Sequence, residues 1–230
     1  MPRLSTESRR DRIAVRGRAD EHELRRAPLD QPHREKRSLS QLKRAAKSCR
    51  ACPLWKPATQ TVFGEGPADA DVMLIGEQPG DREDIEGRPF VGPAGGVLDK
   101  ALAEIGLERD LFYVTNTVKH FKFEMRGKRR LHKRANAAEI AACSQWLHAE
   151  LGRLQPRYLV CLGAMPARAV LGSAFRLNTG RGRWHRLASG QWCLATVHPS
   201  FVLRAHISGD YETVYRAFVA DLRKLDRLPD

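Results

Sequence analysis

Short apolar runs bounded by polar or glycine residues recur along the chain and predict a buried parallel sheet. An uninterrupted apolar run suits a strand that helices cover on both faces. Four segments have this pattern, at 71–76, 111–115, 158–163 and 193–197. Between and after them, apolar residues recur at helical spacing at 95–105, 135–154, 165–171 and 210–225. The alternation predicts an α/β fold with three layers, α/β/α, around a central four-stranded parallel sheet.

Three stretches do not show either pattern. Residues 1–38 are rich in Arg, Asp and Glu with few aliphatic residues, which predicts a basic, mobile or peripheral extension with one short helix at 20–26. The folded domain is then expected at 39–230, with Ser40 capping a helix that runs to Lys47. The stretch 76–96 has many Gly and Pro residues, and 120–134 is polar and basic, so both are predicted to be loops.

The charge balance favours a polyanionic partner. The chain of 230 residues has 40 Lys and Arg against 27 Asp and Glu, a formal net charge of +13. This balance favours nucleic acid over a membrane, although a generally basic soluble protein would show it too. There is no apolar run of membrane-spanning length, and no apolar core of a secretory signal. We therefore expect a cytoplasmic protein and, since nothing marks an oligomer interface, a monomer.

Five cysteines, an odd number in a reducing compartment, make a disulfide framework improbable. Cys49 and Cys52 have the C-x-x-C spacing that lets two thiolates reach one metal. Cys143 lies on a predicted helix and Cys161 in the third predicted strand, so we expect these four thiols to converge and Cys193 to be a small core residue. An iron–sulfur cluster and a structural zinc both suit four thiolates. A redox C-x-x-C with two unrelated buried cysteines is the alternative.

Polar residues follow the predicted strands at the edge where ligands of such sheets bind. Glu77 directly follows the first strand and is a candidate catalytic carboxylate. Asn116 offers the donor and the acceptor needed to read the edge of a nucleobase, although an asparagine turn explains it equally well. His198 is placed to donate to a developing anion, with a core histidine as its alternative. Phe90, in polar and small surroundings, is a candidate for stacking on a base.

One histidine, His132, lies within a run of cations. The flanking side chains are candidates for binding phosphates of a nucleic acid; they are Lys128, Arg129, Arg130, Lys133 and Arg134. Without other information, His132 would be a surface histidine in a solvated basic loop.

As a set, these residues resemble the iron–sulfur (family 4) uracil-DNA glycosylases over roughly 39–228. The matching motifs are Gly76-Glu77-x-Pro79-Gly80, Gly87-x-Pro89-Phe90-Val91-Gly92, Thr115-Asn116-x-Val118-Lys119, the four cysteines in this order, and His198-Pro199-Ser200. Gln78 and the basic loop that ends in Leu131-His132 are similar to the UdgX-type branch, since ordinary family-4 members lack this loop. Leu131 stands where that branch often has Ile, a change expected to be harmless.

The resemblance implies a fold, a cofactor and an activity. It implies the uracil-DNA glycosylase fold and a [4Fe-4S] cluster on Cys49, Cys52, Cys143 and Cys161. It implies excision of uracil from DNA, single-stranded DNA included, and covalent trapping through His132.

The resemblance also implies roles for the other residues. Gln78, Phe90 and Asn116 would bind uracil, His198 would stabilise the departing uracil anion, and Glu77 would orient His132. The flanking cations would keep His132 neutral. Three rival functions remain: a turnover glycosylase without a crosslink, a non-catalytic iron–sulfur protein that binds nucleic acid, and a zinc-clipped hydrolase of nucleotides.

Overall fold

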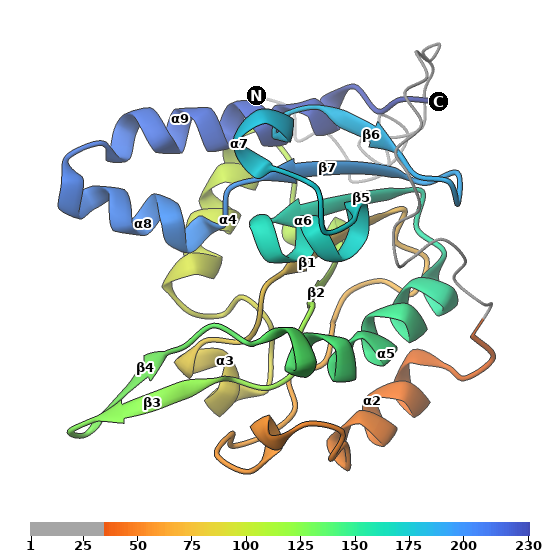
Figure 1. Ribbon diagram of the computed structural model, residues 1–230. Helices are drawn as coiled ribbons and strands as arrows, with labels where there is room; N and C mark the ends of the chain where they lie inside the picture. The colour runs from red at the N-terminus through yellow and green to blue at the C-terminus, as the bar shows by residue number, and fades with distance from the viewer. Residues whose placement is uncertain (1–34) are drawn as a thin grey trace, which may run out of the picture.

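A mostly parallel sheet of five strands forms the centre of the protein in the computed structural model, which describes residues 35–230 (Figure 1). The strand order is β2-β1-β5-β7-β6, with β1–β2, β1–β5 and β5–β7 parallel and β6 antiparallel to β7. The strands are β1 Val72–Gly76, β2 Tyr113–Asn116, β5 Tyr158–Leu162, β6 Trp184–Arg186 and β7 Trp192–Thr196. The four-stranded parallel sheet is confirmed, and β6 extends it by one short antiparallel strand.

Helices cover both faces of the sheet, as the continuous apolar strands require. On one face Leu74 packs with side chains of α4 Pro93–Glu104, α8 Pro199–Ser208 and α9 Tyr211–Leu222. On the other face Met73 and Ile75 pack with α5 Ala137–Leu154 and α6 Ala164–Leu171. Successive residues of a strand point to opposite faces, so one strand serves both layers. The three-layer fold is therefore confirmed.

The folded part begins before residue 39. Helix α2, Leu39–Lys47, is capped by Ser38 rather than Ser40: the Ser38 hydroxyl accepts from the Gln41 N–H, and the Gln41 side chain accepts from the Ser38 N–H. Glu35 already donates its N–H to the Gly152 carbonyl of α5. The helix expected at 20–26 lies outside the described residues.

Both stretches predicted as loops contain regular structure. Helix α3, Asp81–Glu86, occupies part of 76–96; its acidic first turn suits the positive end of the helix dipole. A hairpin of β3 Phe123–Arg126 and β4 Arg129–His132 occupies 120–134. The loop predictions were wrong there. The remaining short elements are η2 Pro53–Trp55, η3 Arg109–Leu111, α7 Leu177–Gly180 and η4 Arg223–Asp226.

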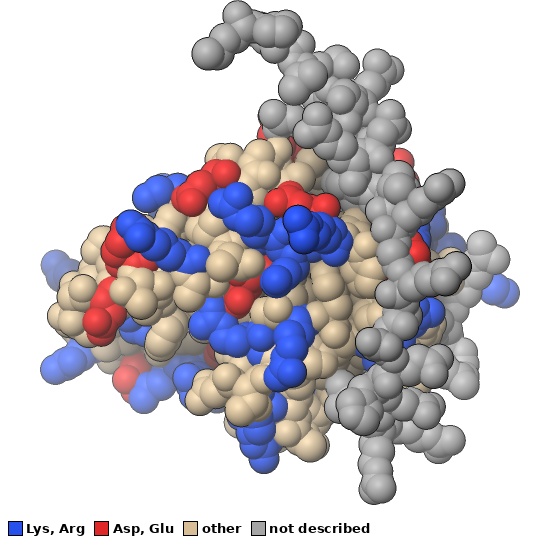
Figure 2. Space-filling view, turned by 90° about the horizontal axis from the view of Figure 1, so that it is seen from above, with Lys and Arg blue, Asp and Glu red and all other residues tan. Residues whose placement is uncertain are grey.

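Basic and acidic side chains are mixed on one face of the protein. Figure 2 shows one face, on which Lys and Arg side chains are interspersed with Asp and Glu rather than gathered in a single patch. None of the helices formed by residues 35–230 has the length and apolarity needed to cross a bilayer. Net charge alone therefore does not mark a binding site on this face.

Candidate active site at the carboxyl end of the sheet

Three predicted site residues, Phe90, Asn116 and His198, come together at the ends of the strands. A side chain at Gly76 would place its Cβ 2.3 Å from Asn116 Oδ1 and 2.6 Å from the Phe90 ring, so both side chains lie over this glycine. The Phe90 and His198 rings are stacked, with centroids 5.8 Å apart. An aromatic face, an amide and an imidazole thus border one small region, the set needed to hold a planar base.

The backbone of Phe90 is held in an unusual conformation. Its φ of 54° lies in the left-handed region, which an aromatic residue rarely adopts. The Arg109 guanidinium donates to the carbonyls of both Pro89 and Phe90, at 2.6 Å for the latter. Gly95 leaves room for the same loop, because a Cβ there would overlap the Phe90 carbonyl. The strain fixes the ring over the site, as is common where a residue is pre-organised for function.

His198 is a neutral hydrogen-bond donor. It caps α8, and its Nδ1 accepts from the Ser200 N–H at 3.1 Å. Arg204 donates to the Ser200 hydroxyl, which lies 2.9 Å from the same Nδ1 and donates to it in turn. The proton of the ring is therefore on Nε2. Burial, followed by the nearby His132 and Arg204, lowers the pKa of His198 to about 4, so the ring stays neutral at physiological pH.

His132 presents an unprotonated nitrogen. It ends β4, and its Nε2 lies 2.9 Å from Gln78 Nε2. The same amide nitrogen also lies within hydrogen-bond distance of the carbonyls of Lys122 and Lys133, at 3.3 and 2.9 Å, so its two protons are shared among three acceptors. Because an amide nitrogen cannot accept a hydrogen bond, the imidazole Nε2 is the acceptor, and the ring proton is on Nδ1. Gln78, predicted to bind uracil, instead contacts His132 in this structure.

Partial burial of the ring is the main reason that His132 is neutral, although the residue as a whole is exposed. This partial burial lowers the pKa of His132, the Glu77 carboxylate raises it, and Arg204 and Arg134 lower it. The expectation that the flanking run of cations keeps it neutral needs correction, because burial is the largest cause. Glu77 lies close enough to act on the ring, and its Oε1 is buried without a hydrogen-bond partner. An unpaired buried carboxylate oxygen is costly and typical of a functional site.

Arg130, predicted to bind DNA, instead forms ion pairs with other side chains of the protein. Its guanidinium is 2.6 Å from Asp84 and 2.5 Å from Asp81, both on α3. It also lies over the rings of Phe121 and Phe123. These contacts fix the hairpin that carries His132 against α3. The exposed members of the run are Lys128, Arg129, Lys133 and Arg134, of which Lys133 pairs with Glu124.

Removing this anchor is expected to loosen the hairpin. Arg130→Met keeps most of the side-chain length but leaves the fully buried Asp84 without its cation, so we expect the free energy of unfolding to fall by about 2 kcal/mol. The matched control is Arg129→Met, an exposed neighbour, whose stability should stay within about 0.5 kcal/mol. Chemical denaturation measures both. Equal losses in the two variants would contradict the anchoring role.

Three of the four predicted metal ligands come together. One cluster of packed side chains, to which α2 and α5 both contribute, contains Cys49, Cys52 and Cys143. The Trp146 indole N–H points at Cys49 Sγ and the Lys119 backbone N–H at Cys143 Sγ, each at 3.2 Å, and such donors favour thiolates. Burial raises the pKa of Cys143 to about 11, and Lys119 opposes this rise. Among the described residues, no three His, Cys, Asp or Glu side chains lie close enough together to hold a metal ion.

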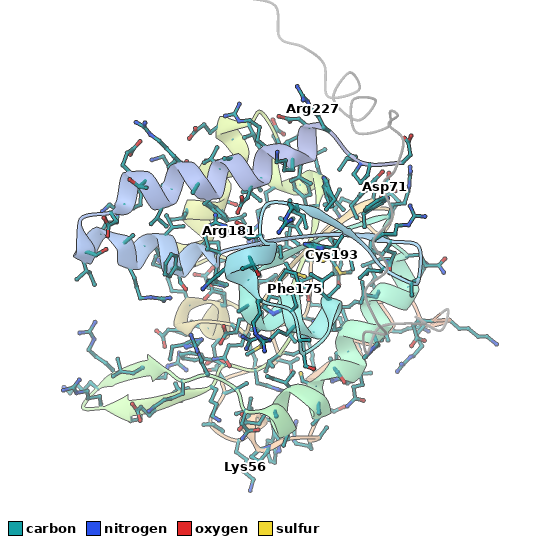
Figure 3. All side chains as sticks on the ribbon, turned by 45° about the horizontal axis from the view of Figure 1, so that its top comes forward. Lys56, Asp71, Phe175, Arg181, Cys193 and Arg227 are labelled. Atoms are coloured by element: carbon teal, nitrogen blue, oxygen red, sulfur yellow. The ribbon has the colours of Figure 1, made fainter. Side chains whose placement is uncertain are left out.

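The fourth, Cys161, is not brought to this cluster. It lies within β5, fully buried, with its Sγ 3.6 Å from Cys193 Sγ in a different part of the core. In Figure 3, Cys193 is seen near the middle of the molecule, whereas Lys56, just after the Cys52 turn, is at its lower edge. The physical reason is that a mid-strand residue points into the layer between sheet and helices. Cys193 is a core residue, as expected.

His120 is connected to the segments that carry Cys49 and Cys143. It follows Lys119, whose N–H is on Cys143, and it is buried. Its Nε2 is 2.9 Å from the Thr61 hydroxyl. That hydroxyl donates to the Ala46 carbonyl, which also accepts from the Cys49 N–H. Thr61 therefore accepts from Nε2–H and leaves the lone pair on Nδ1. Burial lowers the pKa of His120, which keeps that lone pair available.

Comparison with known proteins identifies the family. The sequence model of the Uracil DNA glycosylase superfamily matches residues 63–223. The chain belongs to this superfamily. It is 36% identical to the type-4 uracil-DNA glycosylase of Pyrobaculum aerophilum over 72% of this chain and 85% of that protein. It is 31% identical to that of Archaeoglobus fulgidus over 78% of this chain and 90% of the relative.

Membership of the superfamily confirms the resemblance at the family level, whereas the UdgX-type branch stays a prediction. Glu77, Phe90, Asn116, His132 and His198 all lie inside the matched region. Several residues that shape the site had no signal in the sequence. Arg109, Arg204 and His120 act through contacts formed only in the fold, and His120 is distinguishable only by its position directly after Lys119.

Proposed function

We propose that this protein excises uracil from DNA and remains covalently attached to the resulting site through His132. The observation that carries the proposal is the state of His132: a neutral imidazole at the exposed end of β4, with its Nε2 lone pair directed by Gln78 and the Glu77 carboxylate beside it. The family of the chain supports uracil-DNA glycosylase chemistry. Phe90 and Asn116 are the proposed base-binding residues, by stacking and by amide hydrogen bonds.

Breaking the glycosidic bond leaves positive charge on the sugar and negative charge on uracil. The bond's electron pair departs with the base, so the uracil anion needs a donor. His198 supplies its Nε2–H, because Nδ1 is occupied by Ser200. Uracil must first leave the base stack, which costs about a few kcal/mol and least in single-stranded DNA.

His132 then attacks the sugar cation. The Nε2 lone pair gives up the Gln78 hydrogen bond and forms the bond to the anomeric carbon. The ring keeps its Nδ1 proton and becomes an imidazolium, whose charge the Glu77 carboxylate offsets. A turnover glycosylase would direct a water molecule to the same carbon. The test is formation of a protein–DNA product that survives denaturation, with a thymine oligonucleotide as the control.

The proposed reaction has a definite pH dependence. Only neutral His132 attacks, and its pKa is lowered below 6.5, so capture is fully present at neutral pH and is lost as the pH falls through that lowered pKa. We expect half-maximal single-turnover capture below pH 6.5, measured from about pH 5 to about pH 8. Uracil release by His132→Ser over the same range is the control. A midpoint at or above 6.5 would show that another group governs capture.

We further propose that the chain holds a [4Fe-4S] cluster through Cys49, Cys52, Cys143 and His120. Thiolates and one neutral imidazole suit iron–sulfur ligation. N–H donors on two of the sulfurs and the free Nδ1 lone pair of His120 support this set, whereas the place of Cys161 in the sheet does not. When bound, the cluster would join α2, the segment after β2 and α5.

A further inference from the structure

A fully buried ion pair lies behind the strand end that carries Asn116. Lys119 Nζ and Glu150 Oε2 are 2.5 Å apart, and neither side chain has any exposed surface. Charges removed from water are costly, and packed apolar side chains of similar volume are often as stable as a buried pair or more so. Fold stability alone is therefore a poor explanation for these two charges.

All three protons of the Lys119 ammonium group donate hydrogen bonds, and one of these bonds is to Asn116. An ammonium group has three protons. Lys119 Nζ donates to Thr115 Oγ1 at 2.6 Å, to the Asn116 backbone carbonyl at 2.7 Å and to Glu150. The carbonyl belongs to the last residue of β2, where the regular ladder ends. Lys119 thus holds the carbonyl of Asn116, while the next peptide N–H, that of Thr117, still donates to the Gly76 carbonyl of β1.

The carboxylate partner is itself anchored from several sides. Glu150 projects from α5 and accepts from the Gly64 N–H, the Tyr113 hydroxyl and the Thr115 hydroxyl, each at 3.0 Å. These donors come from two separate segments of the chain, β2 and the segment at Gly64, so the Glu150 carboxylate has little freedom to move. Lys119 is therefore attached to a fixed point.

The pair and the amide of Asn116 lie on opposite faces of β2. Tyr113 and Thr115 point toward Glu150, whereas Asn116 points the other way, with Oδ1 over Gly76 and beside Phe90. Because Lys119 holds the Asn116 backbone from one face of β2, it also fixes the direction of the Asn116 amide on the other face. The direction matters because uracil and cytosine differ in the order of donors and acceptors along one edge.

We propose that the Lys119–Glu150 pair positions the Asn116 amide and thereby determines how well the site selects uracil, an inference that rests on the proposed uracil-binding role of Asn116. Lys119 and Glu150 touch no substrate and are positioning residues. Lys119 also donates its backbone N–H to Cys143 Sγ, so one residue joins the cysteine cluster to the base-reading strand end.

The test is a double-mutant cycle between Lys119→Met and Asn116→Ala. The readouts are the single-turnover rate of uracil excision at saturating single-stranded DNA, and the DNA concentration that gives half this rate. We expect Lys119→Met to lower the saturating rate about tenfold or more, because small misplacements of a positioning group are costly. The half-saturating concentration should hardly change, because exposed cations of the hairpin bind the DNA. In the Asn116→Ala background, Lys119→Met should have no further effect.

Independent, multiplicative losses in the double variant would overturn the inference while leaving the role of Asn116 intact. If Asn116→Ala alone leaves uracil excision unchanged, the proposed base-binding role fails, and the inference fails with it. The two failures are therefore distinguishable.

A second variant separates positioning from stability. Lys119→Met with Glu150→Gln removes both charges and keeps a side-chain oxygen that can accept from Gly64, Tyr113 and Thr115, so we expect a melting temperature closer to that of the parent protein than that of Lys119→Met alone. The excision rate should nevertheless remain as low as in Lys119→Met. Recovery of the rate together with the melting temperature would show that the pair is only structural. If Lys119→Met does not fold, the cycle is run with this double replacement in its place.

Discussion

Replacing His132 with serine is expected to abolish the covalent protein–DNA product while uracil is still released. Serine lacks the nitrogen lone pair that forms the bond to the sugar, and its shorter side chain opens space beside Glu77 for water. The carboxylate can then act as a general base toward that water. Incubation with a uracil-containing oligonucleotide, followed by separate assays for free uracil and for the crosslink, measures both results.

His198→Ala is the matched comparison, because it removes the group that stabilises the leaving base rather than the nucleophile. Loss of one such donor typically lowers the rate by about 10²–10³-fold. We expect this variant to slow uracil release and capture together, whereas His132→Ser separates them. A crosslink that persists in His132→Ser would assign the nucleophile to another residue.

The second large effect is expected at the cysteine cluster. Cys143→Ala should yield protein without the visible absorbance and iron of the cluster, because it removes a proposed ligand whose sulfur accepts the Lys119 N–H. Cys161→Ala should retain both, at a stability cost of about 1 kcal/mol for a small change in the sheet core. Iron analysis and visible spectra of the purified proteins give the answer.

His120→Ala completes this comparison. We expect it to lose iron more readily than Cys161→Ala, because the imidazole is the proposed fourth ligand. If Cys161→Ala loses iron as fully as Cys143→Ala and His120→Ala does not, the fourth ligand is in the strand after all. The fold around Cys161 would then differ from its present place against Cys193.

The sheet could be predicted from the sequence because buried parallel strands are continuous apolar runs. The hairpin that carries His132 could not, since 123–126 and 129–132 are short and largely exposed. Its position depends on Arg130, which pairs with Asp81 and Asp84 far away in the sequence. Local patterns do not contain such tertiary contacts, and the basic run therefore predicts a DNA-binding loop around His132 rather than a hairpin held against α3.

The candidate site was predictable where residues follow strand ends, as Glu77, Asn116 and His198 do. The cysteines show the limit of that reasoning. A cysteine in an apolar strand has the same local pattern whether it binds a metal or fills the core, and Cys161 fills the core in this structure. The contact between Gln78 and His132 joins residues distant in the chain, so motif position alone suggested a uracil contact instead.

The central claim is that His132 becomes joined to DNA, and a denaturing gel tests it most directly. The protein is incubated with single-stranded DNA that contains one uracil, then heated in SDS. We expect a shifted band that contains both protein and DNA, absent with a thymine oligonucleotide and absent with His132→Ser. Release of uracil without any shifted band would contradict covalent capture and indicate a turnover glycosylase.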